Sequence, residues 1–240
     1  MAINLTDNII AMKKIFCLSI MLMLTLVVSA QQKEITKFLG IPIDGTKSDM
    51  IQKLKEKGFT PVYGYDNILC GEFNGVKSNI HVCTNKNKVY RIMVCDVDTR
   101  DQTNTRIRFN NLVYQFQNNP KYMPSSFDKD CLIPENEDIG YEIRINNKRY
   151  ETVFYQMPQK IDTLAMMSRM KAEVSSKYTQ EQIDNPTKEI LKDLTLAGID
   201  YMIEDCVKRP VWFIIKPLGN EFYIALFYDN ELNAANGEDL

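Results

Sequence analysis

His81 and Cys83 are the first residues of this chain to consider for chemistry, because His81 is its single histidine and Cys83 follows two positions later. A cysteine or serine nucleophile needs a base such as histidine within hydrogen-bond reach. Residues two apart in a strand point the same way but lie about 7 Å apart, too far for direct proton transfer. We therefore interpret His81 as structural and expect no catalytic residue. The chain also lacks the nucleophile-elbow, Walker and dinucleotide-binding motifs.

Two groups of carboxylates offer another chemistry: Glu135, Glu137 and Asp138, and then Asp229 and Glu231 with Asn233. Paired carboxylates can serve a hydrolase, which is the alternative function for this chain. The second group has the alternating spacing of a calcium loop, but Ala234 and Leu240 stand where such a loop needs glycine and glutamate. We interpret both groups as solvated surface and expect neither a metal site nor a cofactor.

The cysteines give no zinc-binding spacing. If residues 1–30 are removed, five cysteines remain: Cys70, Cys83, Cys95, Cys131 and Cys206. An odd number in an exported protein leaves at least one unpaired within the chain. The expected strand pairing puts Cys70 and Cys95 on either side of Asn79, about 10 Å apart and too far for a disulfide. Small partly buried apolar side chains are the simplest interpretation.

The stretch 38–97 must position His81, and its clearest element is a helix from Thr46 to Lys57. Thr46 can cap the first turn, with Asp49 at the third helical position. Gly58 suits the left-handed position after the last turn, which predicts a Schellman motif that joins Leu54 to Phe59.

A meander of strands follows the helix. Asn74-Gly75 predicts a type I′ turn that pairs Phe73 with Val76, Gly71 with Ser78, Leu69 with Ile80 and Glu72 with Lys77. A three-residue loop at 86–88 would then pair Thr84 with Tyr90, Val82 with Ile92 and Ile80 with Val94. This register puts Leu69, Ile80 and Val94 under the helix, and His81 beside Met93 on the opposite face.

Periodicity and turn residues predict the remaining elements. A helix is expected over 98–119, with Phe109, Leu112, Val113 and Phe116 as its apolar stripe, and an exposed loop over 124–138. Strands are expected over 139–145 and 149–156, joined by a turn at Asn146-Asn147. Helices are expected over 162–178 and from Asn185-Pro186 to about 208. Two almost wholly apolar strands, 211–216 and 221–229, are expected at the centre of the sheet, with Lys216 facing Glu221 across the turn 217–220.

Three segments, 87–90, 147–150 and 220–223, each lead from a turn into a strand with tyrosine at the same phase. Each expected hairpin follows a helix, which suggests a repeated helix-plus-hairpin unit. The alternative is convergence, because asparagine suits turns and tyrosine suits strands.

The N-terminus predicts export. Lys13 and Lys14 precede an apolar run, 15–28, that is short for a membrane span, and Val28-Ser29-Ala30 has small residues at a cleavage position. The expected domains are a signal peptide, residues 1–30, and one α+β domain, residues 31–240, with a possible division near Pro158. The remaining chain has 27 basic and 30 acidic side chains, and this balance does not favour nucleic-acid binding. Met12 is an alternative start, and no segment of the mature chain is apolar enough to predict a membrane span.

Four segments, 28–31, 38–45, 88–94 and 228–231, carry a resemblance to uncharacterised exported proteins of gut Bacteroidales. The resemblance extends over most of the mature chain. It implies a periplasmic, outer-membrane-associated or secreted location and transfers no catalytic residue.

We expect an α+β fold in which an antiparallel meander and hairpins form one layer and helices form the other. The predicted function is a non-enzymatic binding module for an unknown protein or envelope component. The predicted binding face is the side of the sheet opposite the helix, which carries Glu72, Lys77, Asn79, His81, Arg91 and Met93.

Overall fold

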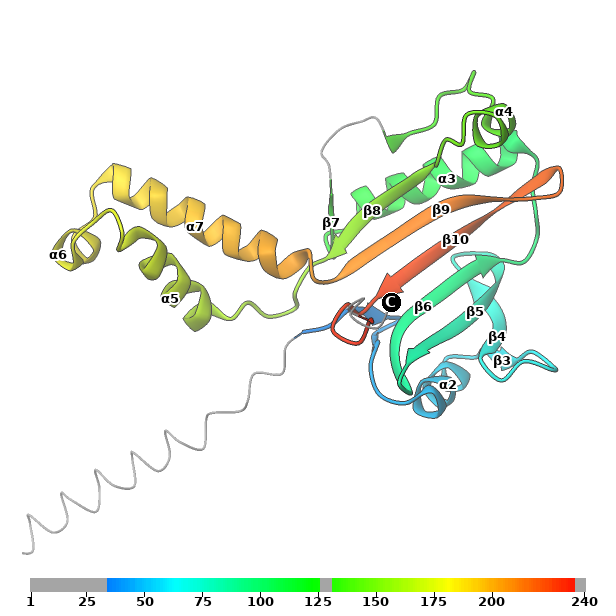
Figure 1. Ribbon diagram of the computed structural model, residues 1–240, viewed down its shortest axis with the longest axis horizontal. Coiled ribbons are helices and arrows are strands. Elements are labelled where there is room, and N and C mark those ends of the chain that lie inside the picture. The colour runs from blue at the N-terminus through cyan, green and yellow to red at the C-terminus, as the bar shows by residue number, and fades with distance from the viewer. Residues whose placement is uncertain (1–33, 126–130, 236–240) are drawn as a thin grey trace, which may run out of the picture. The chain divides into compact units, whose positions relative to one another are not determined.

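The computed structural model describes residues 34–125 and 131–235, and the expected signal peptide lies outside them. Ile35–Leu240 forms one compact unit. Its main feature is an eight-stranded antiparallel sheet, which confirms the expected α+β class (Figure 1). In spatial order the strands are β3 (Thr60–Pro61), β4 (Ile68–Phe73), β5 (Val76–Asn85), β6 (Lys88–Asp96), β10 (Glu221–Asp229), β9 (Pro210–Leu218), β8 (Glu151–Gln156) and β7 (Tyr122–Pro124). A short hairpin, β1 (Lys37–Phe38) and β2 (Ile41–Pro42), precedes them.

The first helix, α2 (Lys47–Glu56), has the caps that the sequence predicts. The Thr46 side chain accepts a hydrogen bond from the backbone N–H of Asp49. After the helix, Gly58 has a φ of +95°, and the N–H of Phe59 donates to the carbonyl of Leu54 at 3.2 Å. These contacts confirm the Schellman motif, which satisfies backbone groups that the end of a helix otherwise leaves unpaired.

Strand pairing in β4 and β5 follows the predicted register throughout, including Leu69 with Ile80 and Glu72 with Lys77. The β5–β6 register is confirmed for Val82 with Ile92 and for Ile80 with Val94. The predicted three-residue loop is wrong: Thr84 pairs with Val89, and a bulge restores the register. Lys86 and Asn87 both have positive φ, so the turn has two residues, as type I′ turns do.

The second helix, α3 (Gln102–Gln117), begins after the cap residue Asp101 and buries the whole predicted stripe, Phe109, Leu112, Val113 and Phe116. Phe116 stacks on Phe154 of β8, and Phe109 meets the edge of Phe213 of β9, so α3 lies along that half of the sheet (Figure 1). Because Phe154 and Phe213 alternate with residues on the other face, α3 covers one face of the sheet.

The predicted strand 139–145 is a helix, α4 (Ile139–Arg144). Asp138 caps it by accepting from the N–H of Tyr141 at 3.0 Å. The apolar residues alternate as in a strand, but Ile139 and Ile143, four apart, are the pair that packs into the core, while Tyr141 and Ile145 are exposed. The expected turn at Asn146-Asn147 therefore joins a helix to β8, and the second of the three suggested hairpins does not form.

The loop before α4 is also less exposed than predicted, since Ile133 is buried in the main core. Its backbone N–H and carbonyl both bond to the side chain of Asn110 on α3. This part of the loop is therefore fixed against α3 by one buried apolar side chain and by two hydrogen bonds to Asn110.

The β9–β10 hairpin has a different register from the predicted one: Leu218, and not Lys216, faces Glu221, and Lys216 faces Tyr223. This register places Pro217, which has no N–H, opposite Phe222. The backbone N–H and carbonyl of Phe222 instead bond to Arg100, at 2.9 and 2.8 Å. The proline therefore costs the sheet no hydrogen bond at this position.

Between β8 and β9 the chain forms α5 (Thr163–Val174), α6 (Gln180–Asp184) and α7 (Lys188–Cys206). The expected helix over 162–178 is confirmed apart from its last turn, and Asp162 is its cap. The second expected helix begins later than predicted, because Thr187 rather than Asn185 caps it. Strands β8 and β9 pair directly, so the sheet continues across the possible division near Pro158. Among the described residues, no helix has the length and apolar character needed to cross a membrane.

Candidate functional site

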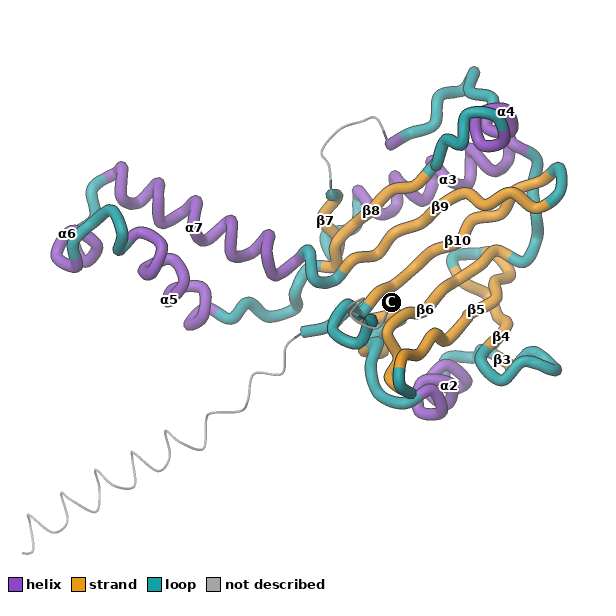
Figure 2. The backbone as a smooth tube through the Cα atoms, in the orientation of Figure 1, coloured by secondary structure: helices purple, strands orange, loops and turns teal. Residues whose placement is uncertain are grey.

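The face of the sheet opposite α2 and α3 carries the predicted binding residues. In β5, Ile80 and Val82 are buried against the helices, so Asn79, His81 and Cys83 point the other way. The same alternation places Arg91 and Met93 of β6 on that face. We call it the helix-free face, since no described helix covers it (Figure 2).

A band of mostly apolar side chains crosses the helix-free face perpendicular to the strands. The pairing registers align one residue from each of six neighbouring strands: Ile68, His81, Met93, Phe227, Trp212 and Val153. Three residues of this row, Met93, Phe227 and Trp212, belong to a small apolar cluster that is separate from the main core. In that cluster Ile214, Ala225 and Phe227 are buried among partly buried neighbours. We call this row of six residues the apolar band.

An ion pair borders the apolar band. Arg91 donates two hydrogen bonds to the carboxylate of Asp229, at 2.6 and 2.8 Å, and Trp212 Nε1 donates to the same carboxylate at 2.9 Å. The Arg91 guanidinium also lies 5.1 Å from the ring centre of Phe227, which stacks on Trp212 with centroids 3.9 Å apart. The hydrogen bond to Asp229 raises the pKa of Arg91 above its ordinary value. The arginine therefore stays charged and also holds the two aromatic rings in place.

His81 and the cysteines of this face have pKa shifts caused by burial. Partial burial lowers the pKa of His81, whose cross-strand neighbours Ile68 and Met93 carry no charge. Burial raises the pKa of the Cys83 thiol, and it raises the pKa of Cys95 to about 11. A thiol with a raised pKa is a poor nucleophile at neutral pH, so this shift does not favour a nucleophilic role for Cys83.

The other predicted residues of the face take two positions. Asn79 lies between Cys70 and Cys95, as expected, one row from the apolar band. Glu72 and Lys77 face each other near the Asn74-Gly75 turn and are exposed, so they form its polar margin. Sequence reasoning missed the C-terminal part of the face. Trp212 of β9 and Phe227 of β10 lie opposite each other on the same face of the sheet. No local pattern in the sequence indicates that β10 pairs with β6.

Three of the candidate carboxylates, Glu137, Asp138 and Asp229, have structural partners, and so does Asp101, which the sequence did not single out. Hydrogen bonds from Lys148 and Tyr150 lower the pKa of Glu137, and hydrogen bonds from Asn104 lower the pKa of Asp101. Asp101 and Asp138 line a solvent-filled hollow of about 480 Å³ beside α4, but both cap helices. A general acid needs a raised pKa, so the lowered pKa values of Glu137 and Asp101 do not suit these two residues to that role. The described residues contain no group of three potential ligands that could hold a metal ion.

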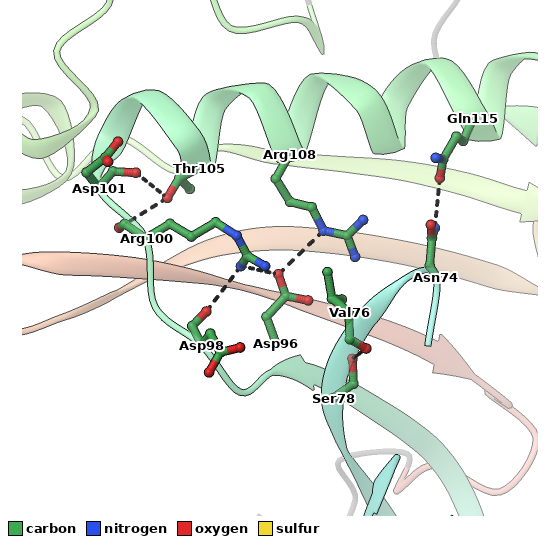
Figure 3. Close-up of polar contacts among 10 residues, drawn as sticks. All are labelled: Asn74, Val76, Ser78, Asp96, Asp98, Arg100, Asp101, Thr105, Arg108 and Gln115. Carbon is green, nitrogen blue, oxygen red and sulfur yellow. Dashed lines mark hydrogen bonds and ion pairs between the residues drawn. The ribbon is translucent and has the colours of Figure 1, made fainter. Parts of the chain in front are cut away.

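A buried ion cluster on the helix side of the sheet secures the β6–α3 connection (Figure 3). Asp96, whose side chain is 1% exposed, accepts from Arg100 at 2.8 Å and from Arg108 at 3.5 Å. Arg100 also donates to the carbonyl of Asp98 at 3.1 Å. Because a buried carboxylate is costly without partners, both arginines serve to neutralise Asp96, and we assign the cluster a structural role.

No family model, curated protein or solved structure matches this chain.

Proposed function

We propose that this protein is an exported binding module that holds another protein against its helix-free face. The supporting observation is the apolar band, which crosses six strands on a side of the sheet that no described helix covers. Phe227 in this band is buried and the other five residues are partly exposed. Monomeric proteins rarely leave a large continuous apolar patch open to solvent, and such patches often mark interaction sites.

The composition of the face favours a protein partner. Tryptophan, methionine and arginine are enriched where proteins contact one another, and here Trp212, Met93 and Arg91 lie together with a polar margin around them. Both cavities described in the molecule lie elsewhere, along α3 and the β9–β10 turn. A broad sheet face with aromatic side chains suits a protein surface better than a small ligand, which needs a concave site.

Export is part of the same proposal. The apolar run 15–28 and the small residues before Gln31 support it, together with the resemblance to exported proteins. The mature chain would then begin at Gln31 and meet its partner in the periplasm, at the outer membrane or outside the cell.

Site-specific photo-crosslinking in the native host tests both parts of the proposal. A benzophenone amino acid replaces Met93, on the apolar band, or Tyr63, which is fully exposed in the loop between β3 and β4 and is not part of the band. We expect one discrete crosslinked protein from position 93 and none from position 63, and the purified partner should bind the purified mature chain. N-terminal sequencing should show that the chain starts at Gln31. Equal labelling at both positions, or a partner that binds the Met93→Lys variant unchanged, would exclude the helix-free face. An intact N-terminus on a cytosolic protein would exclude export.

A further inference from the structure

The helices α5 and α7 form a hairpin whose inner side is well packed. A Cβ on Gly198 would lie 3.3 Å from the sulfur of Met170, so this glycine lets the two helices approach closely. Val174 of α5 and Ile190 and Ala197 of α7 are buried. The hairpin leaves the end of β8 and returns at the start of β9, where Tyr155 pairs with Pro210.

The outer side of the hairpin is apolar as well. Three residues of α7 and its cap residue follow at spacings of three, four and four, which places them on one side of the helix: Leu196, Ile199, Ile203 and Val207. Ile199 and Ile203 are 47% and 43% exposed, because they lie on the side of α7 that faces away from the buried Ala197. On α5, Leu164 and Met167 are also exposed. We call Leu196, Ile199, Ile203 and Val207 the outer stripe.

A line of carboxylates runs along one edge of the outer stripe. Glu189, Asp193, Asp200 and Glu204 follow at spacings of four, seven and four residues, so they also share a side of α7. At about 100° per residue the midpoint of this line lies about 90° around the helix from the midpoint of Ile199 and Ile203. Asp193 and Glu204 have exposed ion pairs with Lys177 and Arg169, whereas no ion pair is found for Glu189 or Asp200 among the described residues.

Net charge separates this hairpin from the rest of the chain. Residues 162–206 contain nine acidic and five basic side chains, a net charge of −4, whereas the whole chain has −2. The remaining residues therefore have a net charge of +2. The negative charge is concentrated on the element that also exposes the outer stripe.

We propose that the outer stripe is a docking site for a basic amphipathic helix of another protein. Its apolar residues would lie on Ile199 and Ile203, and its lysines or arginines would face the carboxylate line. The outer stripe is separate from the helix-free face, so this docking proposal does not depend on the function proposed above.

Charge argues against the other occupants of the stripe. In an antiparallel pair of α7 helices the same edges meet, so a second copy would bring carboxylate against carboxylate. It would offer only Lys188 and Lys192 as cations from α7, both near the start of the helix. Anionic lipid would likewise be repelled by the carboxylate line.

Two designed peptides of equal length test the proposal on the mature chain. Both place leucine at helical spacings i, i+3, i+4 and i+7. One fills the polar positions with lysine and the other with glutamate. We expect the fluorescein-labelled leucine–lysine peptide to raise its anisotropy on binding and the leucine–glutamate peptide to show no binding. Ile199→Ser and Asp200→Lys should each weaken the lysine peptide, by about ten-fold for Ile199→Ser.

Leu218→Ser is the matched control, because Leu218 is an exposed leucine in the β9–β10 turn. It should bind the lysine peptide as the unmodified chain does, and circular dichroism should show that every variant is folded. Three results would overturn the proposal: equal binding of both peptides, unchanged affinity in both hairpin variants, or a chain dimer that Ile199→Ser dissociates. The last would identify a second copy as the occupant. A fourth contrary result would come from anionic phosphatidylserine vesicles. If the chain bound them and Asp200→Lys bound them no more strongly, the carboxylate line would not repel anionic lipid as the proposal requires.

Discussion

Arg91 shows that one residue can belong both to a surface and to the packing beneath it. The sequence predicts it on the side of the sheet opposite the helix, and the structure places it on that side, with a bidentate partner, Asp229, whose side chain is 13% exposed. Removal of the guanidinium would leave that carboxylate with Trp212 as its remaining side-chain donor. Arg91→Ala would therefore change stability as well as binding, and Met93 is the better position for probing the face.

His81 should make the stability of the protein depend on pH. Burial lowers its pKa in the folded chain below the ordinary 6.5, so between the two values the unfolded chain binds more protons. Stability should therefore fall as the pH decreases below about 6.5 and should be unaffected by His81 above it. Urea denaturation of the wild type and of His81→Gln, from about pH 5 to pH 7.5, measures this effect.

His81 is the only histidine, so the difference between the two proteins isolates it from the carboxylates, which both proteins share. Equal pH slopes for the two proteins would mean that the imidazole is as hydrated in the folded chain as in the unfolded one.

At the scale of elements, the sequence predicts what short-range chemistry decides. The α2 caps and the Asn74-Gly75 turn depend on residues within one turn of each other, and both are confirmed. The segment 139–145 could not be read this way, because the same alternating isoleucines suit a strand or one side of a short helix. The cap at Asp138 and the contact of Ile139 with the core decide for the helix.

Gly58→Val should destabilise the protein by at least about 1 kcal/mol. A Cβ at this position meets no atom within 4 Å, so the cost comes from a β-branched residue at a φ of +95° and not from a clash. Gly58→Asn is the matched control, because asparagine adopts the left-handed conformation more readily and should cost less. Chemical denaturation gives both values, and equal stability of Gly58→Val and the wild type would refute the cap.

At the scale of the whole molecule, β10 joins two parts of the chain into one sheet. Val94 of β6 pairs with Leu226 of β10, which in turn pairs with Phe213 of β9. This order also builds the candidate site, since it places Met93 beside Phe227 and Trp212. Local patterns identify β6, β9 and β10 as strands, but β6 and β10 are more than 100 residues apart in the chain and no local pattern indicates that they pair.

The strand order predicts that the two halves of the sheet unfold together. Ile80→Ala removes a fully buried side chain from β5, under α2, and should cost roughly 1–4 kcal/mol because a cavity remains. Trp212, the only tryptophan, lies three strands away on β9 and on the opposite face. Its fluorescence midpoint in urea should therefore fall by the same amount as the far-ultraviolet circular dichroism midpoint. His81→Ala, beside Ile80 but partly exposed, should shift both midpoints less. If Ile80→Ala moved the circular dichroism transition and left the Trp212 transition in place, β4–β6 and β8–β10 would be separate folding units.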